Sequence, residues 1–287
     1  TTPATPTLAL LRDTGVSSTD GITNNATVAV SGLLSGASWQ YTTTGGTTWS
    51  TGIGSTFNLA AGTYGVGAIQ VKQTNLAGTT SSAGSNGSAY TIDLTAPATP
   101  AFSLAADTGA SATDRITNNP VFNVTGLEAN ARWEYSSDSG TTWLSGSGTS
   151  FSLADGTYAA GAIRVRQSDR AGNTSAAAAT TAVTTIDTTP PIALAFALTS
   201  DTGISSTDQI SSSGAITVSG LISGNSWQYT TNGGTSWSQG SGNTFTLAAG
   251  TYAANSVQVR QSDPAGNISP ISSNTNPVSY THLRAHE

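Results

Sequence analysis

The sequence predicts an all-β protein of three tandem sandwich domains, and three observations point to this fold class. The chain repeats itself with a period of 94 residues, since Asp13-Thr14-Gly15 returns as Asp107-Thr108-Gly109 and as Asp201-Thr202-Gly203. Within each repeat, apolar and polar residues alternate in short runs, which are separated by clusters of Gly, Asn, Asp and Ser. No repeat contains a run with the 3.6-residue periodicity of an amphipathic helix.

The length of the repeat indicates a whole domain rather than a stacking unit. Solenoid units of roughly 20–50 residues cannot bury their own apolar face and must stack on one another. Each unit of 94 residues here carries two Trp and can close its own core. We therefore expect domains over residues 1–94, 95–188 and 189–280. Residues 281–287 match nothing at the other repeat ends and hold both His, so we interpret them as an appended tail.

The alternating runs of repeat 1 predict its strands in order. The first run is short and apolar, the next four alternate strictly, and the last closes the unit. These strands are expected over residues 7–11, 27–33, 38–42, 55–59, 68–72 and 89–92. The side chains expected to face the core are Val28, Val30, Trp39, Tyr41, Phe57, Leu59, Ile69 and Val71. Such one-sided patterning is typical of antiparallel strands with one wet face.

About seven short strands in about 95 residues indicate a β-sandwich of immunoglobulin type. Trp39, on the third strand, fits the core Trp of that fold, and Tyr64 after Gly62-Thr63 fits its tyrosine corner. The chain contains no Cys, so packing alone must hold the two sheets together. Two joints end in Pro97 and in Pro190-Pro191. Because Pro stiffens a linker, we expect the three domains to form an extended rod.

Composition excludes several classes of function. Charged residues make up only 8 % of the chain, and the net charge is −6, so nothing is basic enough to hold a nucleic-acid backbone. No apolar run approaches the roughly 20 residues that span a bilayer. The chain has no Met, even at position 1, and we expect it to be a piece of a longer or processed protein. We expect it to be monomeric, with neighbouring repeats of the same chain as its partners.

Aspartates gather where the domains are expected to meet, and 12 of the 15 acidic residues are Asp. In a sandwich of this type, the loop after the first strand and the closing strand reach the same end, where the next domain presents a loop of its own. Hard oxygen donors in such a group suit Ca²⁺, which takes six to eight ligands. The expected ligands are Asp13, Asp20, Asp93, Asp169 and Asn173 at junction 1–2, Asp107, Asp114, Asp187, Asp263 and Asn267 at junction 2–3, and Asp201 and Asp208 at the end of repeat 3.

The alternative for the acidic loop is purely structural, with Asp13 and Asp20 forming Asx turns. The loop is not an EF-hand, because Asn24 stands where that motif needs Glu. At the end of repeat 3, Thr281 stands 94 residues after Asp187, so two carboxylates are missing from the set. We expect calcium to bind more weakly there than at the two junctions.

Two further motifs have competing interpretations. The segment Ser136-x-Asp138-x-Gly140-x-Thr142-Trp143 is similar to the Asp-box hairpin of sialidases, but Thr44 and Asn232 replace its Asp in the other repeats. The period is also roughly twice that of a propeller blade, and we interpret the segment as a structural hairpin. The paired Trp of each repeat could form a carbohydrate platform. Core packing is the alternative, and it is the one that the alternation of Trp39 with Tyr41 favours.

The repeats offer little for catalysis. Without Cys, and with both His in the tail, thiol, Ser-His-Asp and metal-His chemistry are absent from them. Paired-carboxylate hydrolysis would need Asp–Asp or Asp–Glu facing a cleft in each repeat, and repeat 1 contains no Glu. We expect no enzyme activity.

Six motifs recur in the same order in the repeats. They read Asp-Thr-Gly-x-Ser-x-Thr-Asp, Trp-x-Tyr, Gly-Gly-Thr-Thr-Trp, Gly-Thr-Tyr, Asp-x-Ala-Gly-Asn and Ile-Asp-x-Thr-x-Pro. As a set, over nearly all of residues 1–281, they resemble the bacterial immunoglobulin-like repeats of giant, type I secreted cell-surface adhesins. Repeat 1 departs from the pattern at Asn75, where the other repeats have Asp169 and Asp263.

This resemblance implies a secreted, non-enzymatic extender segment on the bacterial surface, with calcium at the domain junctions. The adhesive target would then be contacted elsewhere in the parent protein. The alternative function is a tandem array of carbohydrate-binding modules that recognises a surface glycan. The placement of the aromatic side chains distinguishes the two, because buried Trp favours the stalk and a solvent-facing Trp cluster favours the glycan binder.

Overall fold

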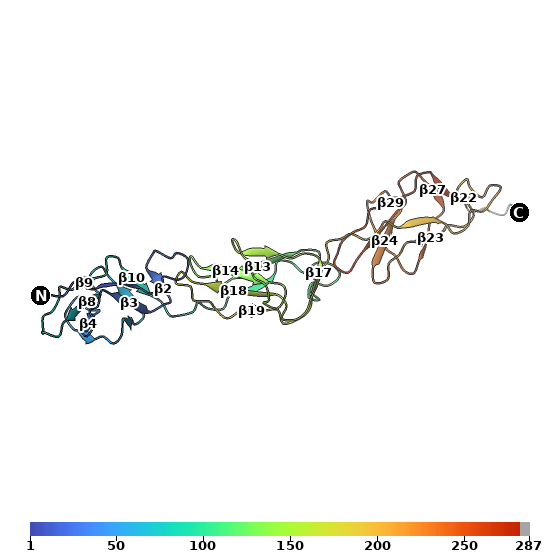
Figure 1. Cartoon of the computed structure of the whole chain (residues 1–287). Coiled ribbons are helices and arrows are strands. Elements are labelled where there is room, and N and C mark those ends of the chain that lie inside the picture. Colours follow the sequence, from blue (N-terminus) through green and yellow to red (C-terminus); the bar gives the residue numbers. More distant parts are fainter. Residues whose placement is uncertain (282–287) are drawn as a thin grey trace. The chain divides into compact units, whose positions relative to one another are not determined.

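The computed structural model describes residues 1–281, and its regular structure there is entirely β (Figure 1). The predicted all-β class is therefore confirmed. The predicted tail, apart from Thr281, lies outside the described residues. No helix that could span a membrane occurs within residues 1–281.

Contacts divide the chain into two compact units. Unit 1 comprises Thr1–Phe102, Val124–Phe151 and Gly161–Thr180, and unit 2 comprises Ser103–Asn123, Ser152–Ala160 and Thr181–Glu287. Repeat 1 thus lies wholly in unit 1, repeat 3 lies in unit 2, and repeat 2 contributes to both. The three-domain division and the rod remain predictions.

Repeat 1 forms three small sheets, with strand orders β5-β4-β8-β9, β1-β3-β6 and β2-β10-β7. All pairs are antiparallel except β2 with β10, which is parallel. The strands are β1 (Thr7–Leu10), β2 (Ile22–Thr23), β3 (Thr27–Ser31), β4 (Ser38–Thr42), β5 (Ser50–Thr51), β6 (Thr56–Asn58), β7 (Gly62–Tyr64), β8 (Gln70–Thr74), β9 (Gly84–Ser85) and β10 (Tyr90–Ile92).

The same ten strands return in the other two repeats. In repeat 2 they are β11 (Ala101–Leu104), β12 (Ile116–Thr117), β13 (Val121–Thr125), β14 (Arg132–Ser136), β15 (Leu144–Ser145), β16 (Ser150–Ser152), β17 (Gly156–Tyr158), β18 (Arg164–Ser168), β19 (Ala178–Ala179) and β20 (Thr184–Ile186). In repeat 3 they are β21 (Ala195–Leu198), β22 (Ile210–Ser211), β23 (Ala215–Ser219), β24 (Ser226–Thr230), β25 (Ser238–Gln239), β26 (Thr244–Thr246), β27 (Gly250–Tyr252), β28 (Gln258–Ser262), β29 (Ser272–Ser273) and β30 (Val278–Tyr280). Repeat 3 also repeats the strand order of all three sheets.

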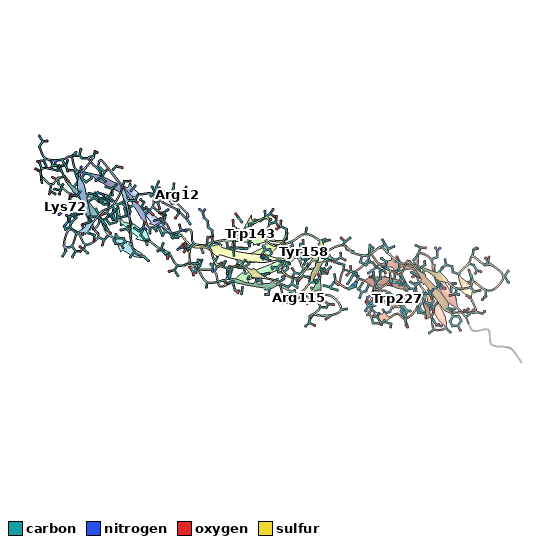
Figure 2. All side chains as sticks on the ribbon, turned by 60° about the horizontal axis from the view of Figure 1, so that its bottom comes forward. Arg12, Lys72, Arg115, Trp143, Tyr158 and Trp227 are labelled. Atoms are coloured by element: carbon teal, nitrogen blue, oxygen red, sulfur yellow. The ribbon has the colours of Figure 1, made fainter. Side chains whose placement is uncertain are left out.

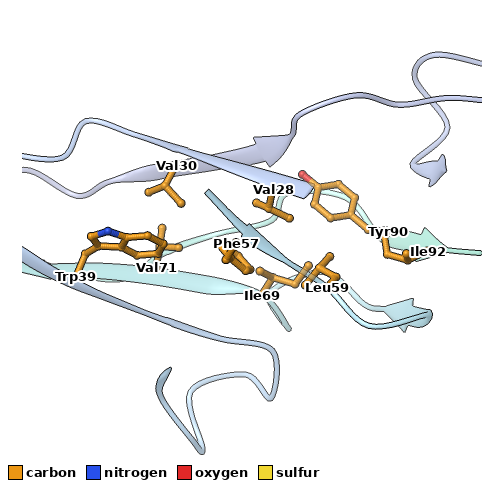
Figure 3. Packing of buried hydrophobic residues seen from close by; sticks show 9 residues of the cluster. All are labelled: Val28, Val30, Trp39, Phe57, Leu59, Ile69, Val71, Tyr90 and Ile92. Carbon is orange, nitrogen blue, oxygen red and sulfur yellow. The ribbon is translucent and has the colours of Figure 1, made fainter. Parts of the chain in front are cut away.

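One core holds the three sheets of repeat 1 together. Its buried members are Val28, Val30, Trp39, Phe57, Leu59, Ile69, Val71, Tyr90 and Ile92 (Figure 3). The expected core residues are thereby confirmed, with Tyr41 half-buried at the edge and stacked on Phe57 at a centroid distance of 4.2 Å. Figure 3 shows Trp39 at one end of this core and Tyr90 at the other. Because all three sheets contribute to it, the repeat is a sandwich.

The tyrosine corner is also present. The Tyr64 hydroxyl donates to the Ala60 carbonyl at 3.0 Å, and the corresponding bond returns at Tyr158 and Tyr252. This bond ties the last residue of β7 to the loop that precedes the strand, and a bond of this kind is typical of immunoglobulin-type folds.

A buried glutamine is the feature of the core that the alternating pattern did not predict. Gln73 is fully buried on the inward face of β8. Its amide nitrogen donates to the carbonyls of Ala4 and Gly32, and its oxygen accepts from the Leu34 amide. Gln167 and Gln261 make the equivalent bonds. This side chain therefore satisfies the backbone of two loops that have no sheet partner there.

Candidate functional site at the repeat joints

The loop after β1, residues 13–24, contains a network of hydroxyl groups and is here called the socket. The Thr14 hydroxyl oxygen lies 2.8 Å from the hydroxyl of Thr23 and 2.6 Å from Asn24 Oδ1. The Asp13 carboxylate closes the same loop, because its Oδ2 accepts from the Gly21 amide at 2.9 Å. These bonds hold the loop open toward the residues that follow β18.

The loop after β18, residues 169–173, packs against the socket and is here called the plug. Asp169 Oδ1 accepts from the amides of Gly172 and Asn173, and Asp169 Oδ2 accepts from the Asn173 side chain at 2.8 Å. Asp263 and Asn267 repeat this arrangement after β28. In repeat 1, Asn75 caps the loop instead and Thr79 replaces the second Asn.

Plug and socket meet at a backbone carbonyl in unit 1. Ala171 is only 1 % exposed, and its carbonyl accepts from the Thr14 hydroxyl at 3.0 Å and from the Asn24 amide at 3.1 Å. The Asn173 side chain donates to the backbone carbonyl of Asp93 at 2.8 Å. The joint thus depends on main-chain oxygens held by short polar side chains.

Two glycines make this close approach possible. A Cβ on Gly15 would overlap the Arg170 carbonyl oxygen, and a Cβ on Gly172 would lie 3.0 Å from the Gly15 backbone. Gly109 and Gly266 stand in the same relation in unit 2, where a Cβ on Gly266 would lie 2.8 Å from the Gly109 nitrogen. A side chain at any of these positions would push the two loops apart.

Unit 2 contains the same joint. The Thr108 hydroxyl donates to the Ala265 carbonyl at 2.8 Å, and the Asn267 side chain donates to the Asp187 carbonyl at 2.7 Å. Ala265 is 1 % exposed, as Ala171 is. The two joints therefore share the Thr-to-carbonyl and Asn-to-carbonyl bonds.

Charge distinguishes the two joints. In unit 1, Arg170 forms an ion pair with Asp20 at 3.2 Å, and Arg132 donates to the Val16 carbonyl at 3.4 Å. The equivalent positions in unit 2 are Pro264 and Ser226, which can make neither contact.

The predicted calcium ligands lie in these loops, and most of their oxygens already have partners. Asp20 and Asp114 accept from the amides of Ile22 and Ile116, and Asp208 accepts from Ile210. Asp93 and Asp187 accept from the amides two residues onward, and Asn173 and Asn267 act through their amide nitrogens rather than their oxygens. Within residues 1–281, no three Asp, Glu, His or Cys side chains are grouped closely enough to hold a metal ion.

One oxygen in each repeat is an exception. Oδ1 of Asp13, of Asp107 and of Asp201 is buried and has no hydrogen-bond partner. A buried carboxylate oxygen without a partner is costly, and a hard cation is one group that would satisfy it.

The two Trp of each repeat are not a free aromatic platform. Trp39, Trp133 and Trp227 are each 5 % exposed. The second Trp of each repeat is half-buried and lies under a cation, with Lys72 Nζ 3.9 Å from the Trp49 ring centroid. Figure 2 labels Lys72 and, in repeat 2, Trp143. Arg166 and Arg260 cover Trp143 and Trp237 at 3.9 and 4.0 Å. A sugar could stack on these rings only by displacing the cation.

The Asp138 hairpin is built as a structural turn. The carboxylate of Asp138 accepts from the Thr142 hydroxyl and amide and from the Ser136 hydroxyl. These hydrogen bonds to the charged form lower the pKa of Asp138 to about 2. The side chain ties its own loop and faces no group on which it could act.

Sequence reasoning identified the loops that meet at the joints, but it did not single out the residues that make the direct contacts there. The joint contacts fall on Thr14, Gly15 and Ala171, which belong to the Asp-Thr-Gly and Ala-Gly motifs. The recurrence of Thr-Gly beside each Asp was the available signal. It indicated that the hydroxyl and the missing side chain mattered as much as the carboxylate.

Comparison with known proteins leaves the family open. No protein-family model matches the sequence, and no curated protein matches it. Among solved structures, the chain is similar to the FN1–FN3 domains of chicken CNTN1, with 14 % identity, 97 % of this chain and 99 % of that chain covered, and a TM-score of 0.27. It is also similar to a BSP domain of a biofilm associated protein, with 14 % identity, 76 % of this chain and 42 % of that chain covered, and a TM-score of 0.20. TM-scores this low carry no argument about fold or function.

Proposed function

We propose that this chain is a structural extender segment of a large bacterial surface adhesin, secreted and displayed on the cell surface. Its role is mechanical. Each repeat folds around its own core, and each joint fixes the orientation of one repeat relative to the next. The binding target belongs to another part of the parent protein. On this proposal the chain has no enzymatic role.

The observation that carries the proposal is the repetition of one joint. The donors Thr14 and Asn173 in unit 1 correspond to Thr108 and Asn267 in unit 2, and each donates to the backbone carbonyl that corresponds in the other unit. A binding array needs identical binding faces and can tolerate variable linkers. An extender needs joints that recur along the chain, and these two side-chain bonds to the neighbouring backbone recur at both joints.

Calcium is the second part of the proposal. The buried, unpartnered Oδ1 of Asp13 and of Asp107 supports a cation beside each joint. Asp20, Asp93 and Asp169 with Asn173 would complete the set in unit 1, and Asp114, Asp187 and Asp263 with Asn267 in unit 2. Several of them would have to exchange a turn hydrogen bond for the metal. Extracellular modules typically bind calcium at roughly 10⁻⁴–10⁻³ M, so such a site would fill outside the cell.

A display experiment separates the extender from the glycan-binding alternative. The chain is inserted between a membrane anchor and a reporter binding domain on a bacterial surface, and capture of the reporter's ligand by intact cells is measured. An extender raises capture over an anchor without the insert, and the purified chain binds no sugar on a glycan array. Glycan binding that is lost when Trp49, Trp143 and Trp237 are replaced by Ala would overturn the proposal.

A further inference from the structure

The chain carries one plug and one socket beyond those that form the two joints. Repeat 1 has a plug after β8, residues 75–79, and repeat 3 has a socket after β21, residues 201–212. Ala77 is exposed, although the Ala at this place is buried in the other two plugs. Ile204, in the socket, is fully exposed. Within residues 1–281, therefore, neither loop is covered by another repeat.

Both loops are already held in shape by hydrogen bonds of their own. Asn75 Oδ1 accepts from the amides of Ala77 and Thr79 at 3.0 Å, which closes the plug. In the socket, the Thr202 hydroxyl lies 2.8 Å from the Ser212 hydroxyl and accepts from the Ser212 amide at 2.7 Å. A surface that is ordered before binding loses less entropy on binding. The two loops can therefore meet a partner at low cost.

The polar groups of this plug and this socket match each other as in the two joints. The Thr202 hydroxyl stands at the place of the Thr that donates to the buried Ala carbonyl, and Ala77 offers the corresponding carbonyl. In both joints the amide after the socket Gly also donates to the residue before that Ala, at 3.1 and 3.4 Å. Ile204 and Leu76 stand at these two places. The Asn bond to the linker has no counterpart, because Thr79 replaces the Asn.

The glycines that allow a close approach are also present. Gly78 has a φ of +79°, and no atom lies within 4 Å of an ideal Cβ on it. Gly203 has a φ of +127°, and the nearest atom lies 3.7 Å from its ideal Cβ. In the two joints, the counterparts of these glycines face each other. Here each glycine has open space on that side, so a second backbone can approach it.

Apolar side chains surround this plug and this socket. Leu76 is 88 % exposed, and it lies beside the turn that contains Leu34, since its Cδ1 would be 3.6 Å from a Cβ on Gly36. Repeat 2 has charged residues at the places of both leucines. In unit 1, the counterparts of Ile204 and Leu34 line one groove. Exposed apolar patches of this kind mark interaction sites, and the apolar residue of the socket suits the apolar rim of the plug.

We propose that the socket of repeat 3 docks on the plug of repeat 1 of a second copy of this chain, so that copies join end to end. The Thr202 hydroxyl donates to the Ala77 carbonyl, and Ile204 packs on Leu76 and Leu34. Contacts between two different surfaces build open filaments unless the ring closes. Without a linker, the copies lack the effective concentration of tethered repeats, so the dilute chain stays the monomer that we expect from the sequence.

Paramagnetic broadening between two chains tests the contact. One chain carries a spin label on Ser206→Cys, in the exposed part of the socket. It is mixed with isotope-enriched wild-type chain in chelator at roughly millimolar concentration. The amides of Leu76, Ala77 and Thr79 in the enriched chain should broaden. A label on Ala112→Cys, the same place in the socket of repeat 2 that a plug already fills, should leave them unchanged. Absence of broadening, or equal broadening from both labels, would overturn the proposal.

A charge at position 76 tests the register of the contact. In unit 1, Arg170 stands at the place of Leu76 and pairs with Asp20, whose counterpart in repeat 3 is Asp208. Leu76→Arg should therefore tighten the association by about two- to fivefold at low salt, as exposed ion pairs do, and Leu76→Glu should weaken it. Sedimentation over a concentration series measures both association constants. Equal constants in the two variants would show that the two ends do not meet in this way.

Discussion

At each joint, two glycines face one another because any side chain would collide with the neighbouring backbone. Gly15 has a φ of +94° and lies against the Arg170 carbonyl, whereas Gly203 has a φ of +127° and no atom closer than 3.7 Å to its ideal Cβ. Both positions disfavour side chains by backbone conformation, but only Gly15 also needs the space. Gly203 is therefore a control for backbone strain alone.

Gly15→Ala should open the joint of unit 1 and leave the repeat folded. The amides of Val16 and Asn24 donate across that joint, and losing a hydrogen bond worth about 1 kcal/mol corresponds to roughly fivefold. We expect hydrogen exchange at these two amides to accelerate at least that much. Gly203→Ala should leave them unchanged, and equal exchange in both variants would contradict the account.

The Asp138 hairpin predicts a pH dependence that is confined to repeat 2. Hydrogen bonds hold the pKa of Asp138 at about 2, below its ordinary value of 3.8. A depressed carboxylate pKa contributes stability above the unfolded pKa, and that contribution disappears as the pH falls toward the folded pKa. The free energy of unfolding of repeat 2 should therefore be higher in the wild type than in Asp138→Asn above pH 4. This difference should shrink as the pH falls from 4 to 2. Asn232 already occupies this position in repeat 3, so that repeat should show no difference between the two proteins.

At the scale of elements, we expect the core to be sensitive to substitution of its buried glutamine. Gln261 is fully buried and satisfies the carbonyls of Ile192 and Gly220 and the amide of Ile222. Gln261→Leu keeps the volume but leaves these backbone groups without that partner, which should cost repeat 3 about 3 kcal/mol.

Native-state hydrogen exchange of β24 and β28 measures this loss. Gln258→Leu, on the same strand, removes only a bond to the Asn255 carbonyl at an exposed site, and it should change stability by at most about 0.5 kcal/mol. A similar loss in both variants would show that the buried bonds do not matter more than exposed ones.

The elements show which parts of the structure the sequence could predict. Strands with alternating side chains were predicted to within about two residues, since burial on one face leaves a period of two in the sequence. The two-residue strands β2, β5 and β9 were missed because two residues cannot display a period. Gln73 continues the inward-facing alternation of Ile69 and Val71. It was not predicted to be buried because its side chain is polar.

The site was predicted less well than the fold, for a physical reason. A carboxylate can be recognised in a sequence from the residue type. A backbone carbonyl such as that of Ala171 cannot, because every residue has one. The interface between repeats depends mainly on such carbonyls. Only the small residues that allow the approach, Gly15 and Gly172, carry information about it.

At the scale of the whole molecule, two variants separate calcium from the direct joint. Asp187→Ala removes a proposed calcium ligand but keeps the backbone carbonyl that accepts from Asn267. It should lower calcium affinity in unit 2 by about tenfold in calorimetry, because a carboxylate ligand is lost. Asn267→Ala breaks the direct bond and should loosen the joint even in chelator. Unchanged calorimetry in Asp187→Ala would remove calcium from the account.

Calcium should also control shape rather than folding. Each core of repeats 1 and 3 is complete without a metal, so far-ultraviolet circular dichroism should stay nearly constant in chelator. Loss of β signal on chelation would show that the metal holds the domains themselves together.

The most direct test of the central claim is the distribution of lengths of this chain in small-angle scattering, measured in millimolar calcium and in chelator. If repeated joints make an extender that calcium stiffens, the distribution is long and narrow with calcium and shorter and broader without it, while the β content is unchanged. A broad distribution in both conditions would contradict the claim that the joints position the repeats. A long, narrow distribution in both would show that the hydrogen-bonded joints alone are enough.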